Sequence, residues 1–78
     1  MNNKNNKLNT KICLKIKLER MKRNLSQEQL AEMADLSRIT IGKIERAEVS
    51  PTIESLEKIA KAFEMDFSQL IDISKVEL

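Results

Sequence analysis

The sequence contains 78 residues, 41% of them hydrophobic and 33% charged, which are globular proportions, and this length allows one domain around one small core. It has no His and a single cysteine, Cys13, which excludes Ser-His and Cys-His nucleophilic pairs, the usual zinc sites and a disulfide framework, and fits the cytoplasm. The net charge is only +2. No apolar run is long enough for a signal peptide or a bilayer span, so we expect no membrane partner. We also expect no cofactor and no small-molecule ligand.

The charges are distributed unevenly along the chain. Residues 1–25 carry a local charge of +7, whereas the remainder carries −5. A basic end on an acidic body indicates an anionic partner that is met from one side. Residues 1–9, rich in Asn and Lys, are predicted to form a flexible arm, in which Lys4 and Lys7 either face that partner or only keep the protein soluble.

The single domain is expected over residues 10–78 and starts with a helix. Thr10 can cap this helix, which is predicted from about Lys11 to Arg23. Its apolar residues form two stripes, one of which contains Ile12 and Ile16. The second stripe is either a scattered surface feature or a contact for a partner, and it consists of Leu14, Leu18 and Met21.

The next two helices are separated by a very short connection. Apolar residues at helical spacing occur on both sides of the turn at residues 35–37, which predicts a helix-turn-helix over residues 27–44. Ser26 caps the first helix of this pair, and Gln29 completes a capping box. Ser37 caps the second helix, predicted over about residues 38–47.

The remaining chain is predicted to form two more helices. Pro51 breaks the preceding helix, and Thr52 caps a fourth helix over about residues 53–64. A fifth, short helix runs from Phe67 to about Ile73. Gly42, inside the third helix, costs up to about 1 kcal/mol relative to Ala, and it either lets the backbone approach DNA or makes room for a packed neighbour. The fold class is therefore all-α, with five helices and no strand.

Several motifs in this order and spacing resemble one family. SQEQLA at residues 26–31 is followed by IER at residues 44–46 and SPT at residues 50–52, within a match over about residues 12–72. This pattern resembles the Cro/cI-type helix-turn-helix domain, the XRE family of phage repressors and small bacterial regulators. The resemblance implies a compact lambda-repressor-like DNA-binding domain. Among its members it looks most like a restriction-modification controller protein, with phage repressor and antitoxin as alternatives.

The helix-turn-helix reading assigns a DNA-contact role to the third helix. The exposed residues early in that helix reach base edges in the major groove, and Arg38 leads because its guanidinium can bond both acceptors of a guanine. The expected base contacts are Arg38, Ile39, Thr40 and Lys43. The expected phosphate contacts lie at helix N-termini and beyond Ile44, and they are Ser26, Gln27, Ser37 and Arg46.

The resemblance implies two further roles. Arg20 and Glu45 are expected to form an internal salt bridge rather than to contact DNA. A homodimer is expected to bind a palindromic operator through two copies of the third helix. The expected dimer interface consists of Met65, Phe67, Leu70, Ile71 and Ile73, with Phe63, Val76 and Leu78 as weaker candidates.

The predicted function is that of a sequence-specific, double-stranded DNA-binding transcriptional regulator, which represses or activates a promoter and controls its own gene. An enzyme is not expected, because the acids of the helices have no nucleophile or metal-binding group beside them in the pattern. A protein-interaction module is the alternative from another class, and its support is the second stripe on the first helix.

Overall fold

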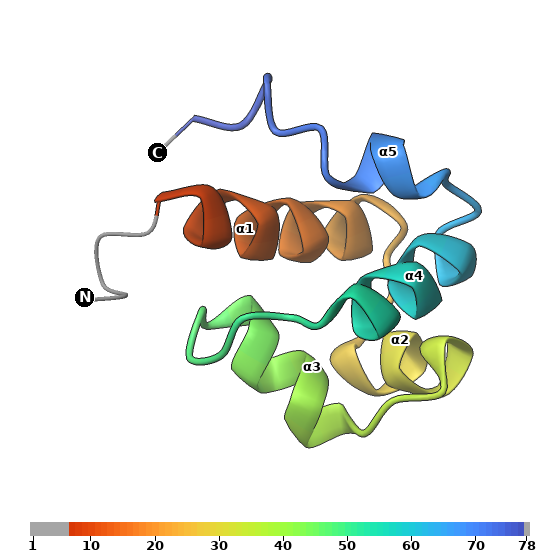
Figure 1. Ribbon diagram of the computed structural model, residues 1–78. Coiled ribbons are helices and arrows are strands. Elements are labelled where there is room, and N and C mark those ends of the chain that lie inside the picture. Colours follow the sequence, from red (N-terminus) through yellow and green to blue (C-terminus); the bar gives the residue numbers. More distant parts are fainter. Residues whose placement is uncertain (1–6, 78) are drawn as a thin grey trace.

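The computed structural model describes residues 7–77, which form five helices and no strand. Figure 1 shows that α1 lies between two layers. The segment that follows α5 passes on one side of α1, and α2, α3 and α4 lie on the other side (Figure 1). The helices are α1 at Lys7–Lys22, α2 at Gln27–Ala34, α3 at Arg38–Glu45, α4 at Ile53–Ala62 and α5 at Phe67–Leu70.

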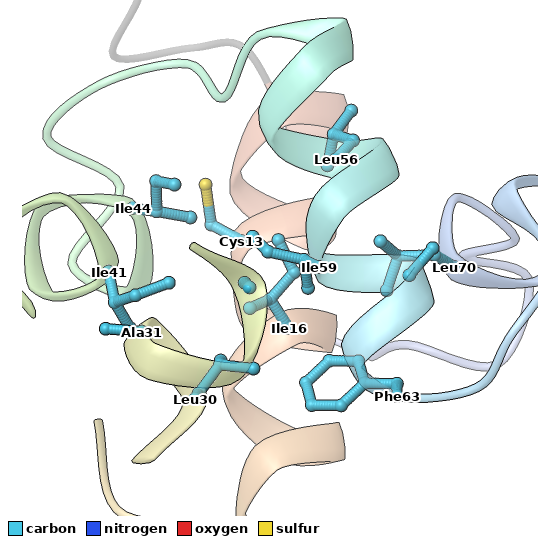
Figure 2. Close-up of a cluster of buried hydrophobic side chains, with 12 residues drawn as sticks. Cys13, Ile16, Leu30, Ala31, Ile41, Ile44, Leu56, Ile59, Phe63 and Leu70 are labelled. Carbon is cyan, nitrogen blue, oxygen red and sulfur yellow. The ribbon is translucent and has the colours of Figure 1, made fainter. Parts of the chain in front are cut away.

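The core is apolar and receives side chains from every helix (Figure 2). Ile16 of α1, Ile41 of α3 and Ile59 of α4 are completely buried. Burial of each such side chain contributes about 1.5–3 kcal/mol to folding. Cys13 joins this core, and desolvation raises the pKa of its thiol. The fully buried side chains are Cys13, Ile16, Leu30, Ile41, Ile44, Ile59 and Leu70.

Four helices end in a residue with left-handed backbone conformation, and none of the four is glycine. Asn24, Asp35, Ala47 and Glu64 have φ values of 56°, 56°, 58° and 58°. After each of them the next backbone N–H bonds a carbonyl five residues back, which satisfies a free helix-end oxygen. Asn and Asp tolerate this conformation better than most residues do. Ala47 and Glu64 adopt it although their side chains do not favour it.

The helix boundaries differ from the predicted ones in several places. α1 begins at Lys7, so Thr10 lies inside the helix and does not cap it, and residues 7–9 do not belong to an arm. Residues 7–9 are helical although they lack an apolar pattern, because their backbone carbonyls accept hydrogen bonds from N–H groups one turn further along α1. The rest of the predicted arm, with Lys4, lies outside the described residues. α3, α4 and α5 end before the predicted boundaries, the first two of them because Ala47 and Glu64 turn the chain.

The predicted dimer face is only partly available. Leu70 is fully buried in the core of the single chain, so its inclusion in the interface was wrong. Phe63 is likewise buried, and its ring lies under the guanidinium of Arg23 at 4.6 Å. The half-buried residues of this face are Met65, Phe67, Ile71, Ile73 and Val76, whereas Leu78 lies outside the described residues.

The segment after α5 is fastened to α1 by a lysine. Lys15 Nζ donates to the backbone oxygens of Gln69 and Asp72, each at 2.6 Å. These carbonyls lie at the end of α5, where a cation is favourable. A groove of about 420 Å³ lies beside this connection. It is lined by Lys15, Leu18, Glu19, Lys22, Asp72, Lys75 and Val76.

Candidate nucleic-acid interface

The helix-turn-helix is formed by α2 and α3, with a tight turn between them. Ser26 Oγ accepts from the backbone N–H of Gln29, and the Gln29 side chain accepts from the Ser26 N–H, so the predicted capping box is confirmed. Ser37 Oγ accepts from the Thr40 N–H at 3.0 Å and caps α3. Ala31 is 4% exposed on α2, so this position is closely packed.

The two faces of α3 differ in burial. Ile41 and Ile44 point into the core and hold the helix in place. Arg38 and Lys43 are exposed on the outer face, and among residues 7–77 neither forms an ion pair. Ile39, with 66% of its surface exposed, lies beside them. Two unpaired cations and an apolar side chain therefore face solvent on a helix that is rigidly anchored.

The remaining predicted base contact is less free. Thr40 is half-buried, and its hydroxyl accepts a hydrogen bond from Ser37 Oγ at 2.8 Å. The methyl group of Thr40 takes no part in this hydrogen bond. Ser26 and Ser37 were predicted to contact phosphates. Their hydroxyls accept hydrogen bonds as helix caps, so a phosphate near either residue would be bound by other exposed atoms of the same helix end.

A buried ion pair joins α1 to α3. Arg20 Nε and Nη2 donate to the two carboxylate oxygens of Glu45 at 2.7 and 3.0 Å, and only 14% and 2% of these side chains are exposed. Arg20 Nη1 also donates to the backbone oxygen of Leu25 at 2.6 Å. The predicted internal pair is present, and neither residue is available to DNA.

Gln27 takes part in the same network, which sequence reasoning missed. Its Nε2 donates to Glu45 Oε1 at 3.0 Å, so Glu45 receives bonds from two different side chains. No local pattern indicated this bond, because the two residues are 18 positions apart. The amide of Gln27 is therefore held in one orientation at the first turn of α2, where free backbone N–H groups favour an anion.

Arg46, the last predicted phosphate contact, lies just beyond α3 and is engaged with an acid. Its Nε donates to Glu48 Oε2 at 2.6 Å. The pKa of Glu48 is lowered from its usual value, mainly by the hydrogen bond that Arg46 donates to its carboxylate. The chain turns back at Ala47, which brings side chains two residues apart to the same side.

Gly42 is buried beneath these side chains. A Cβ at this position would lie 3.0 Å from Arg46 Nη1 and 3.7 Å from Gln27 Oε1. Gly42 was expected either to let the backbone approach DNA or to make room for a packed neighbour. The structure shows packed neighbours, which are the side chains of Arg46 and Gln27.

Gly42→Ala is expected to raise the free energy of unfolding by up to about 1 kcal/mol, because Ala favours a helix interior. The exposed guanidinium of Arg46 can move by the few tenths of an ångström required. Urea unfolding followed by far-UV circular dichroism measures the change. A clear loss of stability would show instead that the neighbouring side chains cannot yield.

Among the described residues there is no group of three His, Cys, Asp or Glu side chains that could hold a metal ion. Within the same part of the chain, no helix has the length and apolar character needed to cross a membrane. What the arrangement offers is a rigid helix with cations on its outer face, next to two helix N-termini. Such a surface suits the phosphates and base edges of a duplex.

Comparison with known proteins identifies similar chains. The model of the helix-turn-helix family HTH_3 matches residues 16–70. The control protein C.SmaI of Serratia marcescens is 46% identical over 62% of this chain and 57% of its own length. The immunity repressor of Bacillus phage phi105 is 40% identical over 73% of this chain and 40% of its own length, so this chain spans about half the length of these relatives.

A solved structure shows the same arrangement of helices. The crystal structure of a mutant of the restriction-modification controller protein C.Esp1396I has a TM-score of 0.75 and 36% sequence identity. The match covers 82% of this chain and 87% of that protein. The all-α fold with a helix-turn-helix is thereby confirmed.

Proposed function

Because this chain belongs to the helix-turn-helix family HTH_3, we propose that it is a sequence-specific, double-stranded DNA-binding regulator of transcription. The outer face of α3 is the observation that carries the proposal. It presents Arg38, Ile39 and Lys43 to solvent on a helix whose inner face is locked into the core. In the proposed complex α3 enters the major groove, where these side chains meet base edges.

The proposed phosphate contacts flank this helix. Arg46 follows α3, and Gln27 opens α2 with its amide held by Glu45. Ser26 and Ser37 cap the N-termini of α2 and α3, and the free backbone N–H groups there are suited to phosphates. These contacts add affinity and salt dependence, and the residues on α3 supply discrimination between sequences.

A homodimer on a palindromic operator is part of the proposal. One recognition helix reads only a short half-site, and two copies related by a twofold axis double the readout. The half-buried apolar side chains of the C-terminal face support this arrangement, because part of their surface stays open to solvent in the single chain. They are Met65, Phe67, Ile71, Ile73 and Val76. The proposed location is the cytoplasm.

The similar proteins suggest the type of regulator. Controller proteins are matched over more than half of their own length, whereas the phage repressor is matched over 40%. We therefore favour a controller-type regulator that also acts on its own promoter. A protein-interaction role, such as that of an antitoxin, is favoured by a separate observation. Leu18 and Met21 are 46% and 52% exposed, and Leu18 lines the groove beside α1.

Fluorescence anisotropy with a labelled duplex from the region upstream of this gene tests the proposal. Binding is expected to be tighter than to a scrambled duplex and to weaken with salt. A duplex that keeps only one half of the palindrome should bind more weakly than the full site. Failure of the folded protein to bind either duplex at low salt would reject the DNA-binding function and favour the interaction role.

A further inference from the structure

The binding edge of the Arg46 guanidinium is already occupied in the free protein. Nε lies 2.6 Å from Glu48 Oε2, and Nη2 lies 3.5 Å from Glu48 Oε1. Both side chains are at least half exposed, so the pair is accessible to solvent and to ligands. Two adjacent oxygens facing the fork of an arginine are also the arrangement in which a phosphate binds to this side chain.

The pair lies at the proposed DNA surface. The other terminal nitrogen of Arg46, Nη1, is 3.0 Å from the position that a Cβ of residue 42 would take, and Gln27 Oε1 is 3.7 Å from the same position. The guanidinium is therefore placed against α3 and beside the first residue of α2. These are the elements to which the proposed function assigns the phosphate contacts.

Glu48 is held in position by its backbone as well as by its side chain. Its N–H donates to the Lys43 carbonyl at 2.9 Å, which closes the turn after α3. The left-handed conformation of Ala47 directs the chain back toward Arg46. The carboxylate is thus part of the folded turn and stands beside a surface that otherwise presents Arg38 and Lys43.

We propose that Glu48 acts as an internal phosphate mimic that occupies the fork of Arg46 until a DNA phosphate displaces it. This inference rests on the proposed function. Displacement replaces one anion by another on the same guanidinium and leaves an acid next to the duplex. Glu48 therefore lowers the affinity for DNA of any sequence, and it limits the time the protein spends on non-specific DNA.

Glu48→Gln is expected to strengthen binding to the upstream duplex and to the scrambled duplex alike, by roughly tenfold at low salt. The slope of log affinity against log salt should become steeper by up to about one, because removal of the acid raises the net positive charge at the interface by one. The ratio between the two affinities should change little, because a phosphate contact carries no sequence information.

A double-mutant cycle with Arg46→Gln separates this mechanism from simple charge repulsion. In the Arg46→Gln background, Glu48→Gln should alter the affinity by less than about twofold, because the fork is gone. Glu64→Gln is the matched control, since it removes one exposed acid just after the C-terminus of α4 and should leave binding unchanged. Unchanged urea midpoints would establish that all variants are folded.

An equal gain from Glu48→Gln with and without Arg46 would overturn the proposal, because Glu48 would then act only through its charge. No gain in the wild-type background would overturn it as well. Failure of the wild-type protein to bind either duplex would contradict the proposed function itself, which is a separate and recognisable result.

Discussion

Arg20→Ala is expected to destabilise the domain by about 3–5 kcal/mol, because it strands the Glu45 carboxylate in the interior. That side chain is 2% exposed, and in the variant Gln27 is the one side-chain donor left to it among the described residues. The Leu25 carbonyl loses its bond to Arg20 as well. A domain of this size has a total stability of only about 5–15 kcal/mol, so much of the variant should be unfolded at growth temperature.

Urea unfolding followed by far-UV circular dichroism measures this loss. Intrinsic protein fluorescence is unsuitable, because the sequence has no Trp and no Tyr. Lys22→Ala is the matched control on the same helix. Lys22 is 70% exposed and bonded to Glu19 at 3.3 Å, so its removal should cost less than about 1 kcal/mol. If Arg20→Ala instead unfolded like the wild type and lost only DNA binding, Arg20 would be a DNA contact.

Arg38→Ala is expected to weaken binding to the upstream duplex by about 1–3 kcal/mol, which is about 5- to 150-fold. Binding to a scrambled duplex should weaken far less, because a base contact is made only on the correct sequence. The structural basis is the exposed position of Arg38 in the first turn of α3, where no ion pair engages it among the described residues. Anisotropy titrations with both duplexes give the ratio of the two affinities.

Two variants test whether the geometry of Arg38 or only its charge matters. Arg38→Lys keeps the charge and removes the planar fork, so it should lose most of the discrimination while retaining the salt dependence. Lys61→Ala removes one exposed cation from the last turn of α4 and should leave the discrimination unchanged. Full discrimination by Arg38→Lys would mean that Arg38 binds a phosphate and reads no base.

Local features of the helix-turn-helix could be predicted from the sequence. The capping box at Ser26 and Gln29 depends on residues three positions apart, and the turn at Asp35 depends on one residue that tolerates positive φ. The inward direction of Ile41 and Ile44 follows from helical spacing. Each of these features is decided within one turn of helix, which is why a short pattern indicates it.

Features that depend on distant residues could not be predicted from local patterns. The bonds from Lys15 to the carbonyls of Gln69 and Asp72 join positions more than 50 residues apart. The pair of Arg46 and Glu48 is close in sequence, but it forms because Ala47 adopts a conformation that alanine disfavours. The Arg20 and Glu45 pair was predicted only through resemblance to a family, since its residues lie on different helices.

The left-handed residues at the helix ends bear on how the protein can be redesigned. Ala47 has a β-carbon where glycine fits without steric cost, and glycine there would remove about 1 kcal/mol of backbone strain. Substitutions on the outer face of α3 that alter the preferred DNA sequence will often cost stability of a similar size. The helix ends therefore supply compensating positions. An engineer can change the specificity of this protein on α3 and restore its stability elsewhere.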